Sequence, residues 1–457
     1  MDKRKDISRR DFLKLAGAGA VVSAASLVGC KPSSRGGSSG AGGYTGETSA
    51  ADMAYRTNPH TGDRVSLLGY GCMRWPVRKN ADGQDEVDQE KVNELVDYAL
   101  AHGVNYFDTA PVYVRGWSES ATGIALSRHP RDSYFIATKA SRGMTLEEGK
   151  AMYRKSLSDL RVDYIDYYLL HNVGSSIESF RQRFVDNGLL DFFLAEKAAG
   201  RIRNLGWSFH GNKETFDYVL AYNDIQWDFC QIQLNYQDWT IPIGASVDAK
   251  YLYDELVRKN VPVVIMEPLL GGRLARIPAQ AQAMMRAVRP DDTPAAWAFR
   301  FAGSPPGVLT VLSGMVYMEH LRDNLHTHAP FEPMTDGEYA VLDEVKEILA
   351  NADYIQCTTC EYCMPCPYGI DIPQVFAHYN KCVSAGQLLE SSSDPEYRKA
   401  RRAFLVGYDR SVPRLRQAHH CIQCDQCRPK CPQNLNIPAE MARVDSYAEK
   451  LRAGAEF

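Results

Sequence analysis

Eight of the twelve cysteines in this 457-residue chain lie in two short runs near its end. The first run spans residues 357–366 and the second spans 421–431, and a proline follows each run. A disulfide framework would instead distribute its cysteines through a small chain. The runs therefore predict a metal-binding unit near the C-terminus.

The spacing within the runs is typical of iron–sulfur proteins. The second run reads C-x2-C-x2-C-x3-C-P, and the first is one residue shorter before its last cysteine. Eight thiolates predict two [4Fe–4S] clusters, with the fourth cysteine of each run binding the cluster of the other run. The predicted ligands are Cys357, Cys360, Cys363 and Cys431 for one cluster, and Cys421, Cys424, Cys427 and Cys366 for the other.

Zinc is the alternative for the same cysteines. Structural zinc takes four ligands, usually from C-x2-C pairs, and two runs of four that each end in proline fit clusters better. Helical patterns at 373–380 and 394–406 make this unit, residues 351–445, resemble the helical ferredoxins. The scattered Cys72, Cys230 and Cys382 are expected to pack as small apolar groups.

The N-terminal residues 1–29 have the order of an export signal. Ser8-Arg9-Arg10-Asp11-Phe12-Leu13-Lys14 resembles the twin-arginine signature, and the uncharged stretch 15–28 is shorter than an ordinary membrane span of about 20 residues. The stretch ends at Cys30, in a sequence that resembles the lipoprotein signal-peptidase box; a coincidental cysteine is the alternative. We expect export of the folded protein by the twin-arginine route, lipidation of Cys30 and membrane anchoring on the periplasmic side, with residues 30–52 as a flexible Ser/Gly linker.

Residues 53–330 alternate between strand-like and helix-like patterns. The predicted strands are 65–68, 105–108, 134–139, 167–171, 204–208, 229–233, 263–266 and 309–313, with helices such as 89–102, 146–160 and 248–259. Eight such units predict a (β/α)8 TIM barrel. A doubly wound open sheet is less favoured, because Arg74 stands where a G-x-G-x-x-G fingerprint after Gly69 needs its third glycine. Residues 331–350 are predicted as a connecting helix and 446–457 as a tail.

Polar residues fall at three successive strand ends, where a barrel of this kind carries its chemistry. Asp108 ends the second strand, Tyr113 follows five residues later, Lys139 ends the third strand and His171 ends the fourth. Each residue alone has an ordinary structural explanation, such as a helix cap or a packed core side chain. Their joint position indicates a catalytic site.

The stretch Gly103-Val104-Asn105-Tyr106-Phe107-Asp108-Thr109-Ala110-Pro111-Val112-Tyr113 resembles the first signature of the aldo-keto reductases, and Lys139 and His171 match the rest of that family's tetrad. The resemblance implies carbonyl reduction by hydride, with Tyr113 as general acid. Lys139, held by Asp108, would lower the pKa of Tyr113, and His171 would orient the carbonyl oxygen.

The same resemblance implies a nicotinamide cofactor, either NADP or NAD. The matching positions are Ser208, Gln231, Met266, Ser313 and Asn324. Phe209 stands where the family commonly has Asn, and Met266 where it commonly has an aromatic residue. Ser313 and His320 replace the basic residues that often bind the 2′-phosphate, although Arg322 could substitute for them.

A barrel fused to a two-cluster domain is similar to the iron–sulfur-containing aldo-keto reductases, on Met364-Pro365 and the stretch 369–373. We expect an oxidoreductase that acts on a small carbonyl or alcohol and exchanges electrons with a flavoprotein or quinone. The alternative is an electron-delivery or binding lipoprotein with structural clusters and a scaffold barrel. The net charge of −4, which becomes about −7 without the basic leader, argues against a nucleic-acid partner.

Overall fold

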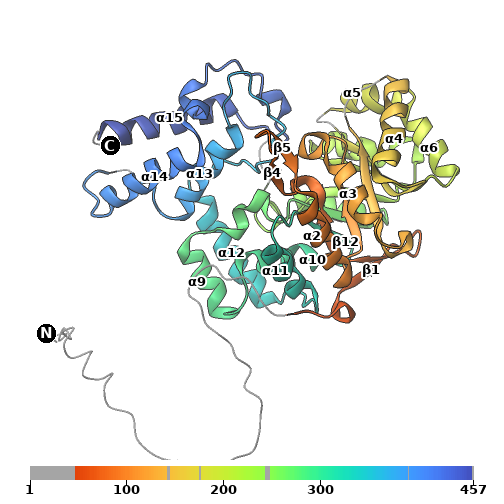
Figure 1. Cartoon of the computed structure of the whole chain (residues 1–457). Helices are drawn as coiled ribbons and strands as arrows, with labels where there is room; N and C mark the ends of the chain where they lie inside the picture. Colours follow the sequence, from red (N-terminus) through yellow and green to blue (C-terminus); the bar gives the residue numbers. More distant parts are fainter. Residues whose placement is uncertain (1–46, 142–144, 174–175, 242–247, 390, 455–457) are drawn as a thin grey trace, which may run out of the picture. The chain divides into compact units, whose positions relative to one another are not determined.

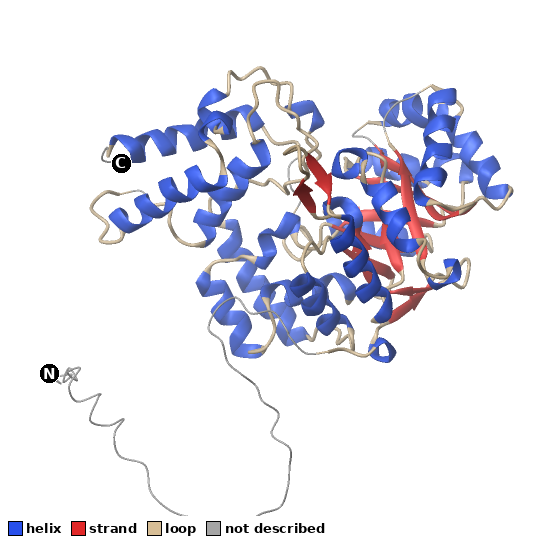
Figure 2. Ribbon diagram, viewed as in Figure 1, coloured by secondary structure: helices blue, strands red, loops and turns tan. Residues whose placement is uncertain are grey.

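The computed structural model describes residues 47–141, 145–173, 176–241, 248–389 and 391–454. Within this part of the chain, eight parallel strands close into a barrel (Figure 2). The strands are β3 (Leu68–Gly71), β6 (Tyr106–Asp108), β7 (Phe135–Ala140), β8 (Ile165–Val173), β9 (Ile202–Phe209), β10 (Phe229–Gln233), β11 (Val263–Met266) and β12 (Val308–Ser313). Because β12 pairs with β3, the sheet has no open edge, which confirms the predicted barrel over the open sheet.

Helices follow the strands and cover the barrel (Figure 1). They are α2 (Gln89–Ala101), α3 (Ser118–Leu126), α4 (Leu146–Leu160), α5 (Ile177–Phe180), α6 (Leu189–Ala198), α7 (Lys213–Leu220), α8 (Ala249–Arg258), α9 (Ala279–Val288), α10 (Pro294–Gly303) and α11 (Met318–His328). The helix predicted at 146–160 is confirmed to the residue. A capping box between Thr145 and Glu148 begins the helix. Arg161, which follows its last residue, has a left-handed backbone conformation and ends it.

The first barrel strand differs from the prediction. Residues 65–68 were expected to form it, but Leu68–Gly71 does. The preceding β2 (Arg64–Ser66) instead pairs antiparallel with β1 (Tyr55–Thr57) outside the barrel. The sequence pattern was misleading because Gly69 and Gly71 have low strand propensity. The barrel needs a glycine at 69, since a Cβ there would lie 2.7 Å from Thr310 Oγ1 and 2.8 Å from Leu312 Cδ2.

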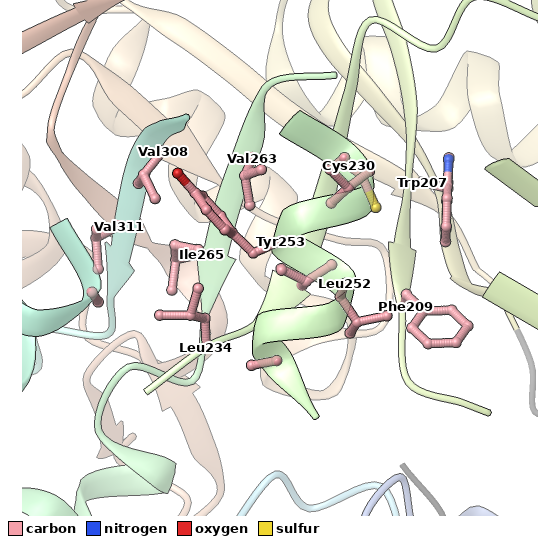
Figure 3. Packing of buried hydrophobic residues seen from close by; sticks show 14 of the residues in the cluster. Trp207, Phe209, Cys230, Leu234, Leu252, Tyr253, Val263, Ile265, Val308 and Val311 are labelled. Atoms are coloured by element: carbon pink, nitrogen blue, oxygen red, sulfur yellow. The ribbon is translucent and has the colours of Figure 1, made fainter. Parts of the chain in front are cut away.

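Side chains between the strands and the surrounding helices form the largest apolar core. Figure 3 shows α8 placing Leu252 and Tyr253 against side chains that leave the outer faces of β9 to β12, Phe209 and Cys230 among them. Phe209 is therefore a core residue rather than a replacement for a cofactor contact. Cys72, Cys230 and Cys382 are all buried.

The region after the barrel is helical. Helix α12 (Asp336–Ala350) leads into α13 (Ile372–Ser384), α14 (Tyr397–Ser411) and α15 (Ile437–Ala453). These last three helices share an apolar core with members such as Phe376, Phe404, Tyr408 and Val444. Among the described residues of 351–454 there is no β-strand, which agrees with the predicted helical type of ferredoxin-like domain.

No helix in the described ranges is both long enough and apolar enough to cross a membrane. The twin-arginine motif, the apolar stretch 15–28 and Cys30 lie outside the described residues.

The contact between α3 and α4 offers a test of the fold. A Cβ at Gly123 would lie 2.2 Å from the backbone oxygen of Asp159, so α3 and α4 must move apart when Gly123 becomes Ala. We expect Gly123→Ala to lower the free energy of unfolding by about 1–3 kcal/mol, measured by denaturant titration. Gly337→Ala in α12 is the matched control, because nothing lies within 4 Å of its Cβ. It should leave stability unchanged or slightly raised, and equal losses in both variants would contradict this account.

Candidate active site and cluster-binding loops

The C-terminal ends of the eight strands, here called the barrel mouth, bring the predicted catalytic residues together. Asp108 ends β6, Lys139 is the penultimate residue of β7, and His171 lies near the end of β8. Parallel pairing sets Asp108 beside Ala137 and Lys139 beside Leu169, so consecutive strand ends lie next to one another. The regular pairing of β8 with β9 shifts between Leu170 and Val173. This is where His171 lies, and such irregularities turn side chains toward active sites.

Asp108 and Lys139 form a buried ion pair. Lys139 Nζ donates to Asp108 Oδ1 at 2.6 Å and to the backbone oxygen of Thr109 at 2.8 Å. Burial raises the pKa of Asp108 and lowers the pKa of Lys139, while their mutual attraction opposes both shifts. An isolated charge would be costly in this position, so each side chain requires the other.

Tyr113 lies next to this pair, at the start of a short 3-10 helix that spans Tyr113–Gly116. Lys139 Nζ is 5.0 Å from the centre of its ring. The pKa of Tyr113 is raised rather than lowered overall, because burial, together with Tyr362 and Asp108, outweighs the attraction expected from Lys139. Lys139 donates to Asp108 and Thr109 rather than to the phenol.

His171 faces Tyr113, with the two rings edge to face and 5.9 Å apart. Burial, together with the charges of Lys139 and Arg183, holds the pKa of His171 well below its usual range, so the imidazole is neutral. Ser141 Oγ lies 2.5 Å from His171 Nδ1. When the Ser141 hydroxyl donates to Nδ1, the ring hydrogen is on Nε2, the nitrogen that lies 3.2 Å from the hydroxyl of Tyr362.

Sequence reasoning missed Ser141, although a signal for it existed. Ser141 follows Lys139 by two residues, and alternate residues of a strand face the same side. It missed Arg183 too, whose guanidinium donates to the backbone oxygens of His171 at 2.7 Å and Asn172 at 2.6 Å. These two side chains fix the His171 ring and its backbone.

Of the five predicted cofactor-binding residues, four belong to barrel strands and one to a helix: Ser208, Gln231, Met266 and Ser313 lie in β9, β10, β11 and β12, and Asn324 lies in α11. Ser208 Oγ accepts from the backbone N–H of Asn172 at 2.7 Å, and Asn324 Nδ2 donates to Ser313 Oγ at 2.8 Å. Gln231 Oε1 is buried without a hydrogen-bond partner among the described residues. A buried, unpaired acceptor is what a carboxamide N–H₂ would satisfy, so these residues fit a nicotinamide.

The two basic candidates for the adenosine end have other neighbours. His320 lies edge to face with Tyr317, with ring centres 5.2 Å apart. The Arg322 guanidinium lies 5.4 Å from the ring centre of Tyr98, a residue of α2. Neither contact selects between NADP and NAD.

The first cysteine loop, residues 356–366, contacts the barrel mouth directly. Arg74 Nη2 donates to Thr358 O at 2.9 Å and to Thr359 Oγ1 at 3.0 Å. Gly271 permits the approach, since a Cβ there would lie 2.1 Å from the oxygen of Thr358. Next to the second run, Gln433 Nε2 donates to Gln233 Oε1 at 3.1 Å.

Glu267 is partly buried, with 17% of its side chain exposed, where both cysteine runs approach the barrel. It follows β11, and its carboxylate accepts from Gln433 Nε2 at 3.3 Å. Burial and the neighbouring Asp238 raise the pKa of Glu267 to about 7. Nothing in the sequence indicated this carboxylate, since its burial depends on segments far apart in the chain.

Both cysteine runs contribute to one thiol-rich region. Cys431 lies close enough to Cys357, Cys360 and Cys363 to influence the pKa of each thiol. Cys366, Cys421 and Cys424 influence the pKa of Cys427 in the same way. A pocket is lined by the last two cysteines of the first run and the first three of the second, namely Cys363, Cys366, Cys421, Cys424 and Cys427.

The arrangement of these thiols bears on the choice of metal. Among the described residues, no three His, Cys, Asp or Glu side chains converge as the ligands of one metal ion do. A single zinc would draw four sulfurs to about 2.3 Å from one point. A [4Fe–4S] cluster binds each cysteine at a different iron, so its ligands stand farther apart. Eight thiols from two runs, which the structure brings into one region, supply the four cysteines that each of two [4Fe–4S] clusters needs.

Comparison with known proteins agrees with this geometry. Residues 67–347 match the aldo/keto reductase family. The chain belongs to this family. Residues 356–436 match a 4Fe-4S dicluster domain, so the barrel of this aldo/keto reductase is followed by an iron–sulfur domain.

Individual relatives cover mainly the barrel. An uncharacterized oxidoreductase, YqkF of Bacillus subtilis, is 26% identical in an alignment of 318 residues that covers 61% of this chain and 92% of the relative. The D-arabinose 1-dehydrogenase of Saccharomyces cerevisiae is 34% identical in an alignment of 104 residues that covers 21% of this chain and 30% of that protein.

Solved structures share the barrel fold. The holo form of an aldo-keto reductase from Bacillus halodurans superposes with a TM-score of 0.52 at 23% identity, over 64% of this chain and 96% of the other. An aldo-keto reductase from Klebsiella pneumoniae in complex with NADPH gives a TM-score of 0.50 at 21% identity, over 64% of this chain and 96% of the other.

A buried carboxyl behind the tetrad predicts a pH dependence of stability. Glu119, in α3, accepts from Thr138 Oγ1 at 2.6 Å, and burial raises its pKa from 4.5 to about 7. Between these two pH values the folded protein binds a proton that the unfolded chain has released, so stability falls as pH rises and the loss is complete above about pH 7. The loss is roughly 3 kcal/mol.

We expect Glu119→Gln to keep the hydrogen bond from Thr138 and to avoid this loss. Its melting temperature should exceed that of the wild type by more at pH 8 than at pH 5, in anoxic thermal melts. Glu94→Gln, at an exposed position of α2, is the control and should show the same difference at both pH values. A Glu119→Gln effect that is constant with pH would contradict the raised pKa.

Proposed function

We propose that this protein transfers hydride between a tightly bound nicotinamide and a small carbonyl or alcohol substrate. The observation that carries the proposal is the buried pair of Asp108 and Lys139, with Tyr113 and His171 beside it, at the mouth of a barrel of the aldo/keto reductase family. A scaffold or binding protein would have no use for an ion pair that is costly to bury.

Each tetrad residue has a defined task in reduction. A nicotinamide, when bound, would supply hydride for the carbonyl carbon. The Tyr113 hydroxyl gives its proton to the carbonyl oxygen, so the product is an alcohol. His171 Nε2 donates a hydrogen bond to the same oxygen while negative charge develops on it. Lys139 places a positive charge near the Tyr113 ring and stabilises the phenolate that remains.

The cofactor would lie beside the tetrad, along the strands β9 to β12 that carry most of the predicted cofactor residues. The unpaired Gln231 Oε1 and the Ser208 hydroxyl would bind the carboxamide, and Met266 would pack on the ring. Ser313 and Asn324 would contact the adenosine part. NADP and NAD both remain candidates, and the NADPH complex of the Klebsiella pneumoniae relative supports NADP.

The C-terminal domain would hold two [4Fe–4S] clusters for electron exchange with a flavoprotein or quinone. Cys431 would join the first three cysteines of the first run, and Cys366 the first three of the second run. The mutual influence of these thiols supports that crossed assignment. Bound clusters supply one-electron transfer, whereas a nicotinamide exchanges two electrons as hydride.

The leader supports export by the twin-arginine route and a lipid anchor on Cys30. Export of a folded protein would allow clusters and a bound nicotinamide to travel inside the chain, and the anchor would keep the protein near membrane quinones. Cell fractionation tests this proposal, because Cys30→Ser should move the protein from the membrane to the soluble fraction.

Denaturation of the protein, isolated anoxically, tests the cofactor. One equivalent of released NADP or NAD per chain is expected, detected by enzymatic cycling assay. No released nucleotide from a protein with intact clusters would contradict the bound cofactor and favour the alternative, an electron-delivery or binding lipoprotein.

Tyr113→Phe tests the proposed acid. It removes the proton that the carbonyl oxygen needs, so the turnover number for aldehyde reduction should fall by about 100-fold or more. Tyr164→Phe is the matched control, because Tyr164 precedes β8 at the opposite end of the barrel and should leave turnover unchanged. Unchanged turnover in Tyr113→Phe would refute this assignment.

The crossed ligand assignment makes a separate prediction. In anoxic EPR spectra of the reduced protein, Cys431→Ser should alter the same cluster signal as Cys357→Ser, and Cys366→Ser the same signal as Cys421→Ser. Cys382→Ser, at a buried cysteine of α13 outside both runs, should leave both signals intact. If Cys431→Ser altered the signal that Cys421→Ser alters, each run would bind its own cluster.

A further inference from the structure

A residue of the first cysteine loop reaches into the catalytic site. Tyr362 lies between the predicted ligands Cys360 and Cys363, yet its hydroxyl is 3.2 Å from His171 Nε2. The same hydroxyl shares a hydrogen bond with Tyr113. Its ring stands edge to face with the His171 imidazole, with centres 6.3 Å apart.

The Tyr362 hydroxyl thus lies where the two hydrogen-bond donors of the tetrad converge. A carbonyl oxygen needs this position in order to receive the proton of Tyr113 and the hydrogen bond of His171. Two oxygens cannot occupy one place, so a substrate oxygen and the Tyr362 hydroxyl exclude each other.

The contacts around the loop favour this closed position. Arg74 binds the loop at Thr358 and Thr359, and Arg273 Nη1 donates to Gln356 Oε1 at 2.5 Å. By contrast, 3.2 Å is at the long end of the hydrogen-bond range, so the contact of Tyr362 with His171 is the weaker part of the closure. A local movement of Tyr362 can therefore open the site while the rest of the loop stays bound.

We propose that Tyr362 is a gate residue of the barrel site: its hydroxyl takes the place of the substrate oxygen, and a carbonyl compound binds only by displacing it. The gate belongs to the cluster-binding loop, so its displacement changes the surroundings of the cluster bound there. This inference deepens the proposed function, because it concerns the same catalytic site.

Binding of 4-nitrobenzaldehyde to the cluster-loaded protein tests the gate without requiring turnover. In Tyr362→Phe the ring remains but both hydrogen bonds of the hydroxyl are lost. The variant therefore has no hydroxyl that competes with the carbonyl oxygen of the aldehyde for Tyr113 and His171. We expect the dissociation constant to fall by about 3- to 10-fold, since one net hydrogen bond contributes about 1 kcal/mol. Tyr362→Ala should bind at least as tightly as Tyr362→Phe. Tyr368→Phe, at an exposed tyrosine of the same domain, is the control and should bind like the wild type.

An unchanged or weaker binding constant in both Tyr362 variants, with the EPR signals of both clusters intact, would overturn the proposal, because Tyr362 would then be neutral or would help to bind the carbonyl. A second readout is the EPR spectrum of the reduced wild-type protein. Saturating 4-nitrobenzaldehyde should shift one cluster signal in the wild type and should not shift it in Tyr362→Ala. Equal shifts in the two proteins would count against the gate.

The outcomes also separate the gate from the proposed function. Tighter aldehyde binding in Tyr362→Phe, together with no released nicotinamide and no turnover in any variant, would support the gate and refute the hydride-transfer function. Turnover that depends on Tyr113, together with unchanged aldehyde binding in the Tyr362 variants, would support the function and refute the gate.

Discussion

The pairing of β12 with β3 closes the parallel sheet into a barrel, and the positions of the tetrad and of the predicted cofactor residues follow from this closure. In a closed parallel barrel, every strand end reaches the same mouth. Asp108, Lys139 and His171 come from three consecutive strands, and Ser208, Gln231 and Met266 from the next three. An open sheet would set the first and last of these residues far apart. Closure is also why the first strand must carry Gly69, whose missing side chain leaves room for Thr310 and Leu312.

Burial at the mouth governs the chemistry of the tetrad. Burial disfavours charge on every titratable group there, so Lys139 is paired with Asp108 and His171 is neutral. A Ser141 hydroxyl that donates to Nδ1 favours the tautomer in which a neutral His171 donates from Nε2, so Ser141 is part of the arrangement. The pKa of Tyr113 is raised mainly by burial and next by the neighbouring Tyr362. The two halves of the chain thus influence the same proton.

The contact between the cysteine loop and the barrel joins the iron–sulfur domain to the catalytic site. Two domains joined only by a linker would have independent sites. Here Arg74, Gly271 and Tyr362 form a continuous contact from the strand ends to the cysteine loop, and Glu267 with Gln433 adds a second contact. The catalytic site and the cysteine loop are therefore in direct contact.

The sequence alone was enough to predict the barrel, because alternating apolar runs are a local signature, and the structure confirms it. Cysteine spacing and polar residues at strand ends likewise predicted the cluster ligands and the four tetrad positions, and the structure brings these side chains near one another. The sequence placed α4 to the residue, since a capping box begins it. It misplaced the first strand, because Gly69 and Gly71 hide a strand that only pairing with β12 and β6 stabilises. Tertiary structure alone decided that Phe209 faces the core, that Tyr113 has a raised pKa, and that Tyr362 reaches His171, 191 residues away along the chain. Burial and contacts between distant segments set these properties, and no local pattern of residues encodes such contacts.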